Sequence, residues 1–545
     1  MGRSPLFRKL ARAMRIARYC DANKISTAEG IEQVAARQIA ASRREPNRRE
    51  FLVHMGKLAV AGAVGSSAWP LQKCLAASSP NVSVAIVGAG LAGLVCADEL
   101  KRNGIAAALY DANNRVGGRC FSLGGFFPGQ VAERGGEFID NLHKTMIGYA
   151  QRFDLQLEEV GKNPPGEVFY FFDGRLVPES EVVDEFRDLV AAMRDDLRTV
   201  GRPTADIHTD ADAALDFTSL REYLETRGAG AIVRQTLEQV YLAEYGLEID
   251  LQSCLSFLFF IHADRRSKFR PLGVFSDERY HVIGGNDQIV AGLRSGLNGQ
   301  IRLGMRLVRA RKTAAGRVEL IFQNGAKTVS VIHDTVVFAL PFSTLRDVEL
   351  DTSLGLSSWK LRAINELRYG TNAKMMVGFD SRPWLALGSN GTSYSDLPNH
   401  QVTWETNPTK ATALHAVLTD YASGNRGANL NPKKAQTEAA LFLRDLDRVY
   451  PGALAAAPRD AKGQFRVHLE HWPSNPLVKG SYTCNHPGYF TTIADNEAKP
   501  VGNLYFAGEH TSSFYEWQGF MEGAALSGIR AAKEILRDIK VGALQ

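Results

Sequence analysis

Cysteine is scarce in this sequence, and the few cysteines present form no recognisable site. The chain has 545 residues and six cysteines, at positions 20, 74, 96, 120, 254 and 484. They are too scattered for a disulfide scaffold, and no Cys-x-x-Cys pair or Cys/His cluster has metal-ligand spacing. We therefore expect neither a disulfide-dependent fold nor a metal centre.

Long hydrophobic runs are also lacking. No apolar stretch approaches the roughly 20 residues that cross a bilayer, which excludes a polytopic membrane protein. The composition is 45% hydrophobic and 23% charged, with 50 glycines. These values exclude wholesale disorder, collagen-like repetition and a coiled coil. A globular chain of this length normally forms two or three packing units rather than one core.

The positive charge is concentrated at the N-terminus. Residues 1–57 contain 13 Lys or Arg and five Asp or Glu, a net charge of +8, while the whole chain has +5. The other 488 residues therefore have a net charge of −3. A body without a basic excess offers no electrostatic case for binding nucleic acid.

The first 77 residues are predicted to be an export leader. Arg48-Arg49 is followed by Phe51-Leu52, and an uncharged stretch spans residues 58–72. This pattern resembles a bacterial twin-arginine signal, and the stretch is short for a membrane anchor. We expect export to the periplasm through the twin-arginine machinery. A solvated basic tail before the first strand is the alternative.

The start of this leader has the pattern of an amphipathic helix. Apolar and basic residues fall on two faces at helical spacing, with Leu6, Phe7, Leu10 and Met14 on one face and Arg8, Lys9, Arg12 and Arg15 on the other. A basic amphipathic helix can lie on an anionic membrane surface. The pattern predicts a peripheral membrane contact through the leader.

A dinucleotide-binding motif opens the body of the chain. The β-branched run at 82–87 predicts a buried strand, and Gly88-Ala89-Gly90-Leu91-Ala92-Gly93 follows directly. A helix and a second strand, which ends in Asp111, complete the unit. The glycines permit a tight turn, close approach of a pyrophosphate and close packing of helix on strand, and the acid accepts hydrogen bonds from ribose hydroxyls. The N-terminus of the helix favours phosphate.

Further glycine-rich segments narrow the cofactor to FAD. Arg119 ends the segment 114–119 and can pair with phosphate, and Gly135 and Gly136 permit close backbone approach. Near the C-terminus a strand runs into Gly508-Glu509, and a glycine-rich turn at 519–523 precedes the last helix.

Together these segments resemble the flavin-containing amine oxidase superfamily, which includes monoamine, polyamine and L-amino-acid oxidases. The resemblance covers residues 82–540 in the expected order. It implies an α/β fold in which a Rossmann-like FAD-binding domain is interleaved with an α+β substrate-binding domain. We assign residues 82–145, 280–344 and 471–540 to the first domain, and residues 146–279 and 345–470 to the second.

Local patterns agree with this layout. Helical patterns at 181–200 and 220–242 fall in the substrate domain, and the segment 300–340 has the pattern of a meander with a turn at Asn324-Gly325. Asn286 precedes a helix and is predicted to cap it.

The resemblance also implies a reaction. In this family, hydride passes from the carbon bearing a neutral amine to flavin N5 and leaves an imine, and O2 then takes the electrons to yield H2O2. The protein has to supply orientation, a dry site and stabilisation of the charge that reduction creates. We therefore expect an oxidoreductase acting on the C–N bond of a small-molecule amine.

Lys374 is the catalytic candidate. It lies in the apolar strand pattern at 372–379 and matches the family lysine that reaches flavin N5 through a water. Burying a lysine without a function is costly. The alternative is an edge-strand lysine whose ammonium reaches solvent.

The resemblance places further residues around the flavin and the amine. Glu509 would hydrogen-bond the ribityl or ribose region, with helix capping as the alternative. The turn at 519–523, with Met521, would present N–H groups to the flavin, and the backbone of Val308 would meet the adenine. The candidate walls of the substrate site are Trp472, Tyr482, Trp517 and Phe520, of which Tyr482 and Phe520 match the two aromatic positions that flank the amine.

Two positions depart from well-known members. Ser481 stands where monoamine oxidases carry the cysteine that links to flavin, so we predict non-covalent FAD. No arginine occurs at 135–140, where many L-amino-acid oxidases bind the substrate carboxylate. Asp140 falls where polyamine oxidases hold an acid that attracts a second ammonium; a solvated loop carboxylate is the alternative.

The leading prediction is an exported FAD-dependent oxidase of a primary or secondary amine, including di- and polyamines. The main alternative is an L-amino-acid oxidase or a flavoenzyme of the tryptophan 2-monooxygenase type. An FAD desaturase or porphyrinogen oxidase would share the glycine motifs, as would a non-enzymatic flavin-binding protein. The resemblance also allows a homodimer.

Overall fold

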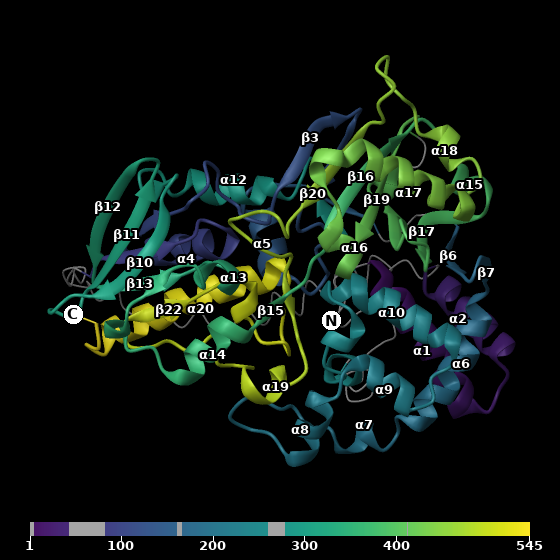
Figure 1. Ribbon diagram of the computed structural model, residues 1–545, viewed down its shortest axis with the longest axis horizontal. Helices are drawn as coiled ribbons and strands as arrows, with labels where there is room; N and C mark the ends of the chain where they lie inside the picture. Colours follow the sequence, from purple (N-terminus) through teal and green to yellow (C-terminus); the bar gives the residue numbers. More distant parts are fainter. Residues whose placement is uncertain (1–4, 43–81, 161–165, 260–277, 411–412, 545) are drawn as a thin grey trace, which may run out of the picture.

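The computed structural model describes residues 5–42, 82–160, 166–259, 278–410 and 413–544. One half of the molecule is built around a parallel sheet and the last helix, and the other half around a large mixed sheet with a group of helices below it (Figure 1). Each half combines separate stretches of sequence. This is the interleaved α/β architecture that the sequence predicts.

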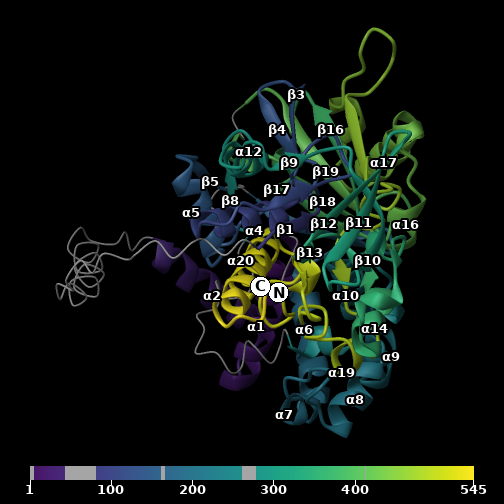
Figure 2. The ribbon, with the colours of Figure 1, turned by 90° about the vertical axis from the view of Figure 1, so that its left-hand side faces the viewer.

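The parallel sheet carries the predicted dinucleotide unit. Its central strand, β1 (Val84–Val87), is buried along its whole length, and the helix α4 (Leu91–Arg102) follows it. The last helix, α20 (Met521–Lys540), packs beside α4, as Figure 2 shows. The strand order is β22-β13-β1-β2-β9, with β22 at Leu504–Phe506, β13 at Thr335–Phe338, β2 at Ala108–Tyr110 and β9 at Ile301–Arg302.

Two glycines let α4 approach its neighbours closely. A Cβ atom on Gly93 would lie 1.9 Å from the carbonyl oxygen of Gly88, and a Cβ on Gly528 would lie 2.3 Å from that of Ala92. Close packing leaves the backbone no room to move aside. Gly93 therefore lets α4 pack on the loop that follows β1, and Gly528 lets α20 pack on α4.

The segment 300–340 is only partly the predicted meander. Its middle forms an antiparallel sheet, and the turn after Asn324 has Gly325 at φ +58°. Its two ends, β9 and β13, belong to the parallel sheet instead, because parallel strands of one sheet need not be neighbours in sequence. The antiparallel strands are β10 (Arg306–Lys312), β11 (Val318–Asn324) and β12 (Lys327–His333), and β14 (Glu349–Leu350) joins the sheet by pairing with β10 in parallel.

The other half contains a seven-stranded sheet. Strand β16 (Ala373–Phe379) lies between β20 and β19 and is buried throughout. Its odd-numbered residues pack against α17 (Ala435–Val449) on one face, so Lys374 points to the opposite face. The strand order is β20-β16-β19-β18-β17-β6-β7, with β20 at Val467–His471, β19 at Ala416–Ala422, β18 at Val402–Glu405, β17 at Ser389–Ser395, β6 at Glu167–Phe172 and β7 at Arg175–Val177.

The helical stretches predicted for this half exist but are interrupted. The pattern at 220–242 forms two helices, α9 (Leu220–Thr226) and α10 (Ala231–Tyr245), because Gly228 adopts φ +66° between them. The pattern at 181–200 likewise divides into α6 (Glu179–Ala192) and α7 (Asp196–Thr199).

The remaining strands and helices are shorter or lie around these two sheets. The strands among them are β3 (Ser122–Phe127), β4 (Gln130–Glu133), β5 (Leu157–Glu159), β8 (Tyr280–Val282), β15 (Arg368–Tyr369) and β21 (Thr483–Cys484). The helices are α5 (Lys144–Arg152), α8 (Asp210–Phe217), α12 (Asp287–Ser295), α13 (Phe342–Leu345), α14 (Ser358–Glu366), α15 (Pro383–Ala386), α16 (Gly424–Asn429), α18 (Ala453–Ala456) and α19 (Tyr489–Thr492).

The N-terminal segment forms a helical hairpin on the second half. Helices α1 (Pro5–Asn23) and α2 (Thr27–Ser42) pack on α6, and α1 also contacts α10 (Figure 1). Met14, on the face predicted to meet a membrane, is 4% exposed because it packs into the protein core. A leader that is free to bind a membrane would leave Met14 exposed, whereas here the protein itself covers this side chain. Arg48-Arg49 lies outside the described residues.

Among the residues described, no helix is both long and apolar enough to cross a membrane. The same part of the chain contains no group of three or more His, Cys, Asp or Glu arranged to hold a metal ion.

Candidate active site

A cavity of about 260 Å³ lies between the two halves. At one end it is lined by Gly88 and Gly90 of the glycine loop, and at the other by Trp404 and Tyr421 of the seven-stranded sheet. The predicted cofactor motifs and the predicted catalytic lysine therefore meet in one space.

The glycine loop leaves room for a ligand. A Cβ atom on Gly90 would have no neighbour within 4 Å, so this position opens onto the cavity. Ala89 lies behind the loop, where its N–H donates to Asp111 Oδ2 at 2.7 Å. Asp111 also accepts from Asn113 N at 2.8 Å and lines the cavity. The acid thus braces the loop and faces the space where a ribose would lie.

Arg119 and Glu509 form an ion pair in the cavity wall. Arg119 Nη1 donates to Glu509 Oε1 at 2.8 Å and to the carbonyl oxygen of Ser481 at 2.7 Å. Thr483 Oγ1 donates to Glu509 Oε2 at 2.5 Å. Burial alone would raise the pKa of Glu509. Arg119 and the hydrogen bonds lower it by a larger amount, so the pKa lies below its ordinary value. Both carboxylate oxygens of Glu509 accept from the Arg119 and Thr483 side chains, and neither accepts from a helix N-terminus in the described part of the chain, so the helix-capping alternative is wrong.

The remaining cofactor candidates lie around the same cavity. Gly135, Gly136 and Met521 line it. Val308 does not, although its neighbour Leu307 does; the pairing of β10 with β11 skips Val308, which is a bulge. Its predicted adenine contact stays a prediction.

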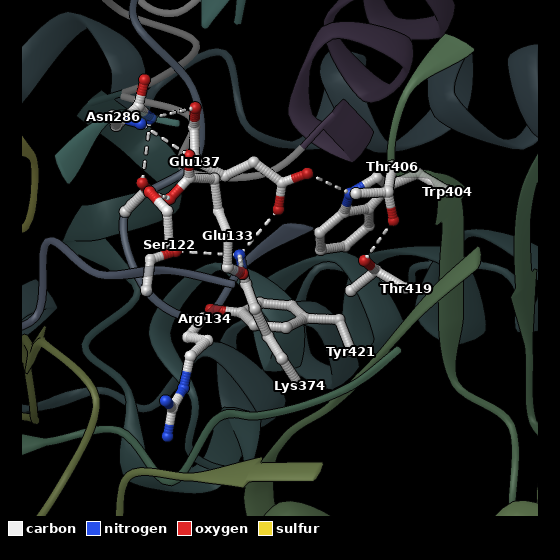
Figure 3. A network of polar contacts seen from close by, with 12 residues as sticks. Ser122, Glu133, Arg134, Glu137, Asn286, Lys374, Trp404, Thr406, Thr419 and Tyr421 are labelled. Carbon is white, nitrogen blue, oxygen red and sulfur yellow. Dashed lines mark hydrogen bonds and ion pairs between the residues drawn. The ribbon is translucent and has the colours of Figure 1, made fainter. Parts of the chain in front are cut away.

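Lys374 is buried and paired rather than directed to solvent. Its ammonium donates to Glu137 Oε2 at 2.7 Å, to Gly135 O at 2.8 Å and to Glu133 O at 3.2 Å (Figure 3). Since β16 is an interior strand, the edge-strand alternative is wrong. The ion pair with Glu137 fixes the Lys374 ammonium at the cavity wall.

Asn286 anchors the segment that carries Glu137. Its side-chain amide donates to Glu137 O at 2.8 Å and to Gly136 O at 3.1 Å, and its Oδ1 accepts from Val282 N. The predicted capping of α12 is wrong, because these contacts occupy the side chain. Asn286 N also donates to Glu133, whose pKa burial raises to about 7.

Three of the four predicted aromatic walls line the cavity: Trp472, Tyr482 and Phe520. The Tyr482 hydroxyl donates to Ala243 O at 2.8 Å, and the Trp472 indole donates to Arg134 O at 2.9 Å, which fixes both rings. Trp517 does not line the cavity. It packs edge-on against His143, with ring centroids 4.5 Å apart, and supports Phe520 from behind.

Asp140 is buried but does not line the cavity. It is 1% exposed and accepts from Glu278 N at 2.9 Å, so the alternative of a solvated carboxylate is wrong. Its N–H donates to His143 Nδ1 at 3.0 Å, and burial lowers the pKa of His143 to about 3. Two other acids of this region, Glu137 and Glu278, line the cavity.

The residues present fit a flavin dinucleotide. Helices α4 and α20 both begin at the cavity, where Leu91 and Met521 line it, and helix N-termini favour phosphates and other negative charge. The open position at Gly90 and the acid at Asp111 complete a dinucleotide cradle. The fold and the site together define a dinucleotide-binding oxidoreductase with an aromatic substrate chamber.

Comparison with known proteins agrees with this class. The family model for flavin-containing amine oxidoreductases matches residues 91–536. The chain belongs to this family, and it is therefore a flavin-dependent oxidoreductase acting on C–N bonds.

Individual relatives are distant. The chain is 24% identical over 477 residues to the putative L-amino-acid oxidase YobN of Bacillus subtilis, with 85% of this chain and 96% of the relative covered. It is 27% identical over 502 residues to the flavin-dependent L-tryptophan oxidase RebO of Lentzea aerocolonigenes, with coverage of 83% and 98%. The structure of cyclohexylamine oxidase from Brevibacterium oxydans superposes with a TM-score of 0.70 at 22% identity, covering 85% of this chain and all of the other.

Several residues of the site were not predicted from the sequence. Glu137, Phe138 and Glu278 line the cavity, as do Trp404 and Tyr421. Glu137 and Phe138 lie within a glycine-rich segment that marked the site, so their position was a usable signal. Trp404 and Tyr421 come from β18 and β19, whose neighbours are set by sheet pairing and cannot be read locally.

Proposed function

We propose that this protein is an FAD-dependent amine oxidase that transfers hydride from a neutral amine to flavin and passes the electrons to O2. One observation carries the proposal: a single cavity joins the dinucleotide cradle at Gly90 to a chamber walled by Tyr482 and Phe520, with Lys374 beside it. Bound FAD would supply the hydride acceptor at N5.

The chain's own residues would bind and orient the amine. The rings of Tyr482, Phe520 and Trp472 offer apolar walls that exclude water and favour an uncharged nitrogen over an ammonium. Hydrogen bonds hold Tyr482 and Trp472 in place, so the substrate meets a preorganised surface. The N-terminus of α20, where Met521 lines the cavity, would stabilise the negative charge that hydride transfer places on a bound flavin.

We favour an amine over an amino acid, because residues 135–140 contain no arginine that could bind a substrate carboxylate. Glu278, an acidic residue in the cavity lining, is compatible with a second ammonium on the substrate. A di- or polyamine is therefore the preferred substrate class. The second candidate is an L-amino-acid oxidase, because YobN is named a putative L-amino-acid oxidase and RebO an L-tryptophan oxidase.

Peroxide release separates these candidates. Purified protein supplied with FAD is mixed with mono-, di- and polyamines and with L-amino acids, and H2O2 is measured. We expect the protein to oxidise amines. Tyr482→Ala and Phe520→Ala should each reduce this turnover at least about tenfold, which corresponds to about 1.4 kcal/mol of transition-state stabilisation. Turnover of amino acids alone would establish the second candidate, and amide products would indicate a monooxygenase.

FAD is proposed to be bound without a covalent link. Ser481 lines the cavity where a linking cysteine would stand, and its hydroxyl donates to Asn372 Oδ1 at 2.5 Å. A serine cannot form the thioether. Acid precipitation should leave the flavin in the supernatant, and flavin retained on the precipitated polypeptide would contradict the proposal.

Export through the twin-arginine pathway to the periplasm is also proposed, on the basis of the Arg48-Arg49 pattern. That pathway carries folded proteins, which suits a protein that binds its cofactor before export. Replacing both arginines with lysines should retain the protein in the cytoplasm, as measured by cell fractionation. Unchanged periplasmic recovery would contradict it.

A further inference from the structure

The ion pair between Lys374 and Glu137 is a buried charge pair in the wall of the active site. The two side chains are 7% and 3% exposed, and their charged atoms are 2.7 Å apart. All three ammonium donors of Lys374 have acceptors, and Glu137 supplies the only charged one among the hydrogen-bond partners described for it. Removing two charges from water is unfavourable unless their mutual attraction offsets the loss of solvation, so we consider a function for this pair.

Both oxygens of Glu137 accept hydrogen bonds. Oε2 accepts from Lys374, and Oε1 accepts from the indole N–H of Trp404 at 3.0 Å, as Figure 3 shows. The Lys374 ammonium and the Trp404 indole can only donate hydrogen bonds. A carboxylate offers each of them an acceptor oxygen, whereas the NH2 group of an amide would face one of them with a second donor. Asn286 holds the Glu137 backbone in place. The site is thus built for a carboxylate at this position.

We propose that Glu137 is the counter-ion and positioning residue of Lys374, and that it keeps this wall of the flavin cavity electrically neutral. The proposal rests on the proposed function, since it requires flavin in the cavity. Glu137 acts through Lys374: it fixes the ammonium against the site and offsets its charge.

The charges on this pair should set how easily the bound flavin accepts electrons. Reduction adds negative charge to the cavity, which an uncompensated positive charge stabilises and an uncompensated negative charge opposes. Neutralising Glu137 therefore raises the reduction potential of the flavin, and neutralising Lys374 lowers it. Removing both charges returns the potential toward that of the unchanged protein.

The experiment measures the reduction potential of bound FAD in Glu137→Gln, in Lys374→Met and in the double variant. We expect shifts of opposite sign for the two single variants and a smaller shift for the double variant. Shifts of the same sign, or none, would overturn the proposal while leaving amine turnover by the unchanged protein intact. A chain that takes up no flavin overturns both this proposal and the proposed function.

The same sheet offers a matched control. Glu405 accepts from Arg382 Nε at 2.7 Å and from the Trp384 indole at 3.2 Å, with ion-pair side chains 3% and 5% exposed, and none of these residues lines the cavity. Glu405→Gln should therefore lower thermal stability without moving the flavin potential. If Glu137→Gln behaves in the same way, Glu137 has a structural role alone and the proposal fails.

A second measurement, on the apoprotein, does not depend on flavin. Trp404→Phe removes the indole N–H, so it should restore part of the thermal stability that Glu137→Gln loses to two opposed donors. The double variant Glu137→Gln/Lys374→Met should unfold at a higher temperature than either single variant, because no buried charge stays unpaired. If the losses of thermal stability simply add in both double variants, Glu137 does not interact with Trp404 and Lys374 as described, and the proposal is contradicted.

Discussion

Gly90 and Gly93 lie in the same loop, but the absence of a side chain serves a different purpose at each. A Cβ on Gly93 would meet backbone at 1.9 Å, whereas a Cβ on Gly90 would meet nothing within 4 Å. The first glycine is needed for packing of the protein itself. The second leaves space that only a bound molecule would use.

This contrast gives a prediction for two alanine substitutions. Gly90→Ala should change the stability of the apoprotein by less than about 1 kcal/mol, since glycine at a helix N-cap is only modestly preferred, yet weaken FAD binding at least about tenfold, or 1.4 kcal/mol. Gly93→Ala should lose about 1–3 kcal/mol of stability through overpacking. Thermal unfolding and FAD titration measure both effects. Unchanged FAD affinity in Gly90→Ala would contradict the placement of the cofactor.

Local elements were predictable from the sequence, and contacts between distant elements were not. The β1–α4–β2 unit follows from spacing within 30 residues, and so does the turn after Asn324. The hydrogen-bond partners of Lys374 come from the end of β4 and the segment that follows it, which are distant in sequence and meet β16 only in the folded protein. The position of Asn286 just before a helix predicts a cap. Its side chain instead donates to the backbone of Glu137, which is distant in sequence.

The docked N-terminal hairpin was also beyond local reasoning. Its basic, amphipathic pattern suits a membrane surface or a protein surface equally, and only the structure shows α6 beneath it. Arg187 of α6 donates to Asp21 at 2.8 Å, and to Ile25 O and Thr27 Oγ1, across this contact. The hairpin is thus held by polar as well as apolar contacts.

Arg187→Ala should release the hairpin. Losing hydrogen bonds that involve a charged donor costs about 1.5–3 kcal/mol, so we expect faster proteolysis within residues 5–42. Arg198→Ala is the control, because its pair with Asp195 is exposed and such pairs contribute about 0–1 kcal/mol. Equal proteolysis rates in the two variants would show that the hairpin is not docked through Arg187.

The stability of the whole molecule should depend on pH through its buried histidines. Burial lowers the pKa of His143, His400 and His510 to about 3, from an ordinary value of 6.5. Below pH 6.5 the unfolded chain binds protons that the folded chain does not, so stability falls as the pH drops toward 3. Each histidine contributes up to about 1.4 kcal/mol per pH unit.

Buried acids act in the opposite direction. Burial raises the pKa of Glu133 and Glu497 to about 7, so the folded state holds protons that the unfolded state loses between pH 4.5 and 7, and stability falls as the pH rises through that window. The histidines and these acids therefore oppose one another between pH 4.5 and 6.5.

Denaturation midpoints measured from pH 4 to 8 test this balance. His400→Asn should flatten the acid side of the profile, whereas the exposed His208→Asn should not. An acid side that is equally steep in His400→Asn and in the unchanged protein would contradict the account.

The most direct test of the whole account is anaerobic mixing of the FAD-loaded protein with a panel of amines and L-amino acids while the flavin absorption is followed. We predict that the yellow colour bleaches with at least one amine and returns when O2 is admitted. A protein that binds FAD and stays yellow with every compound would contradict the claim that this cavity oxidises C–N bonds.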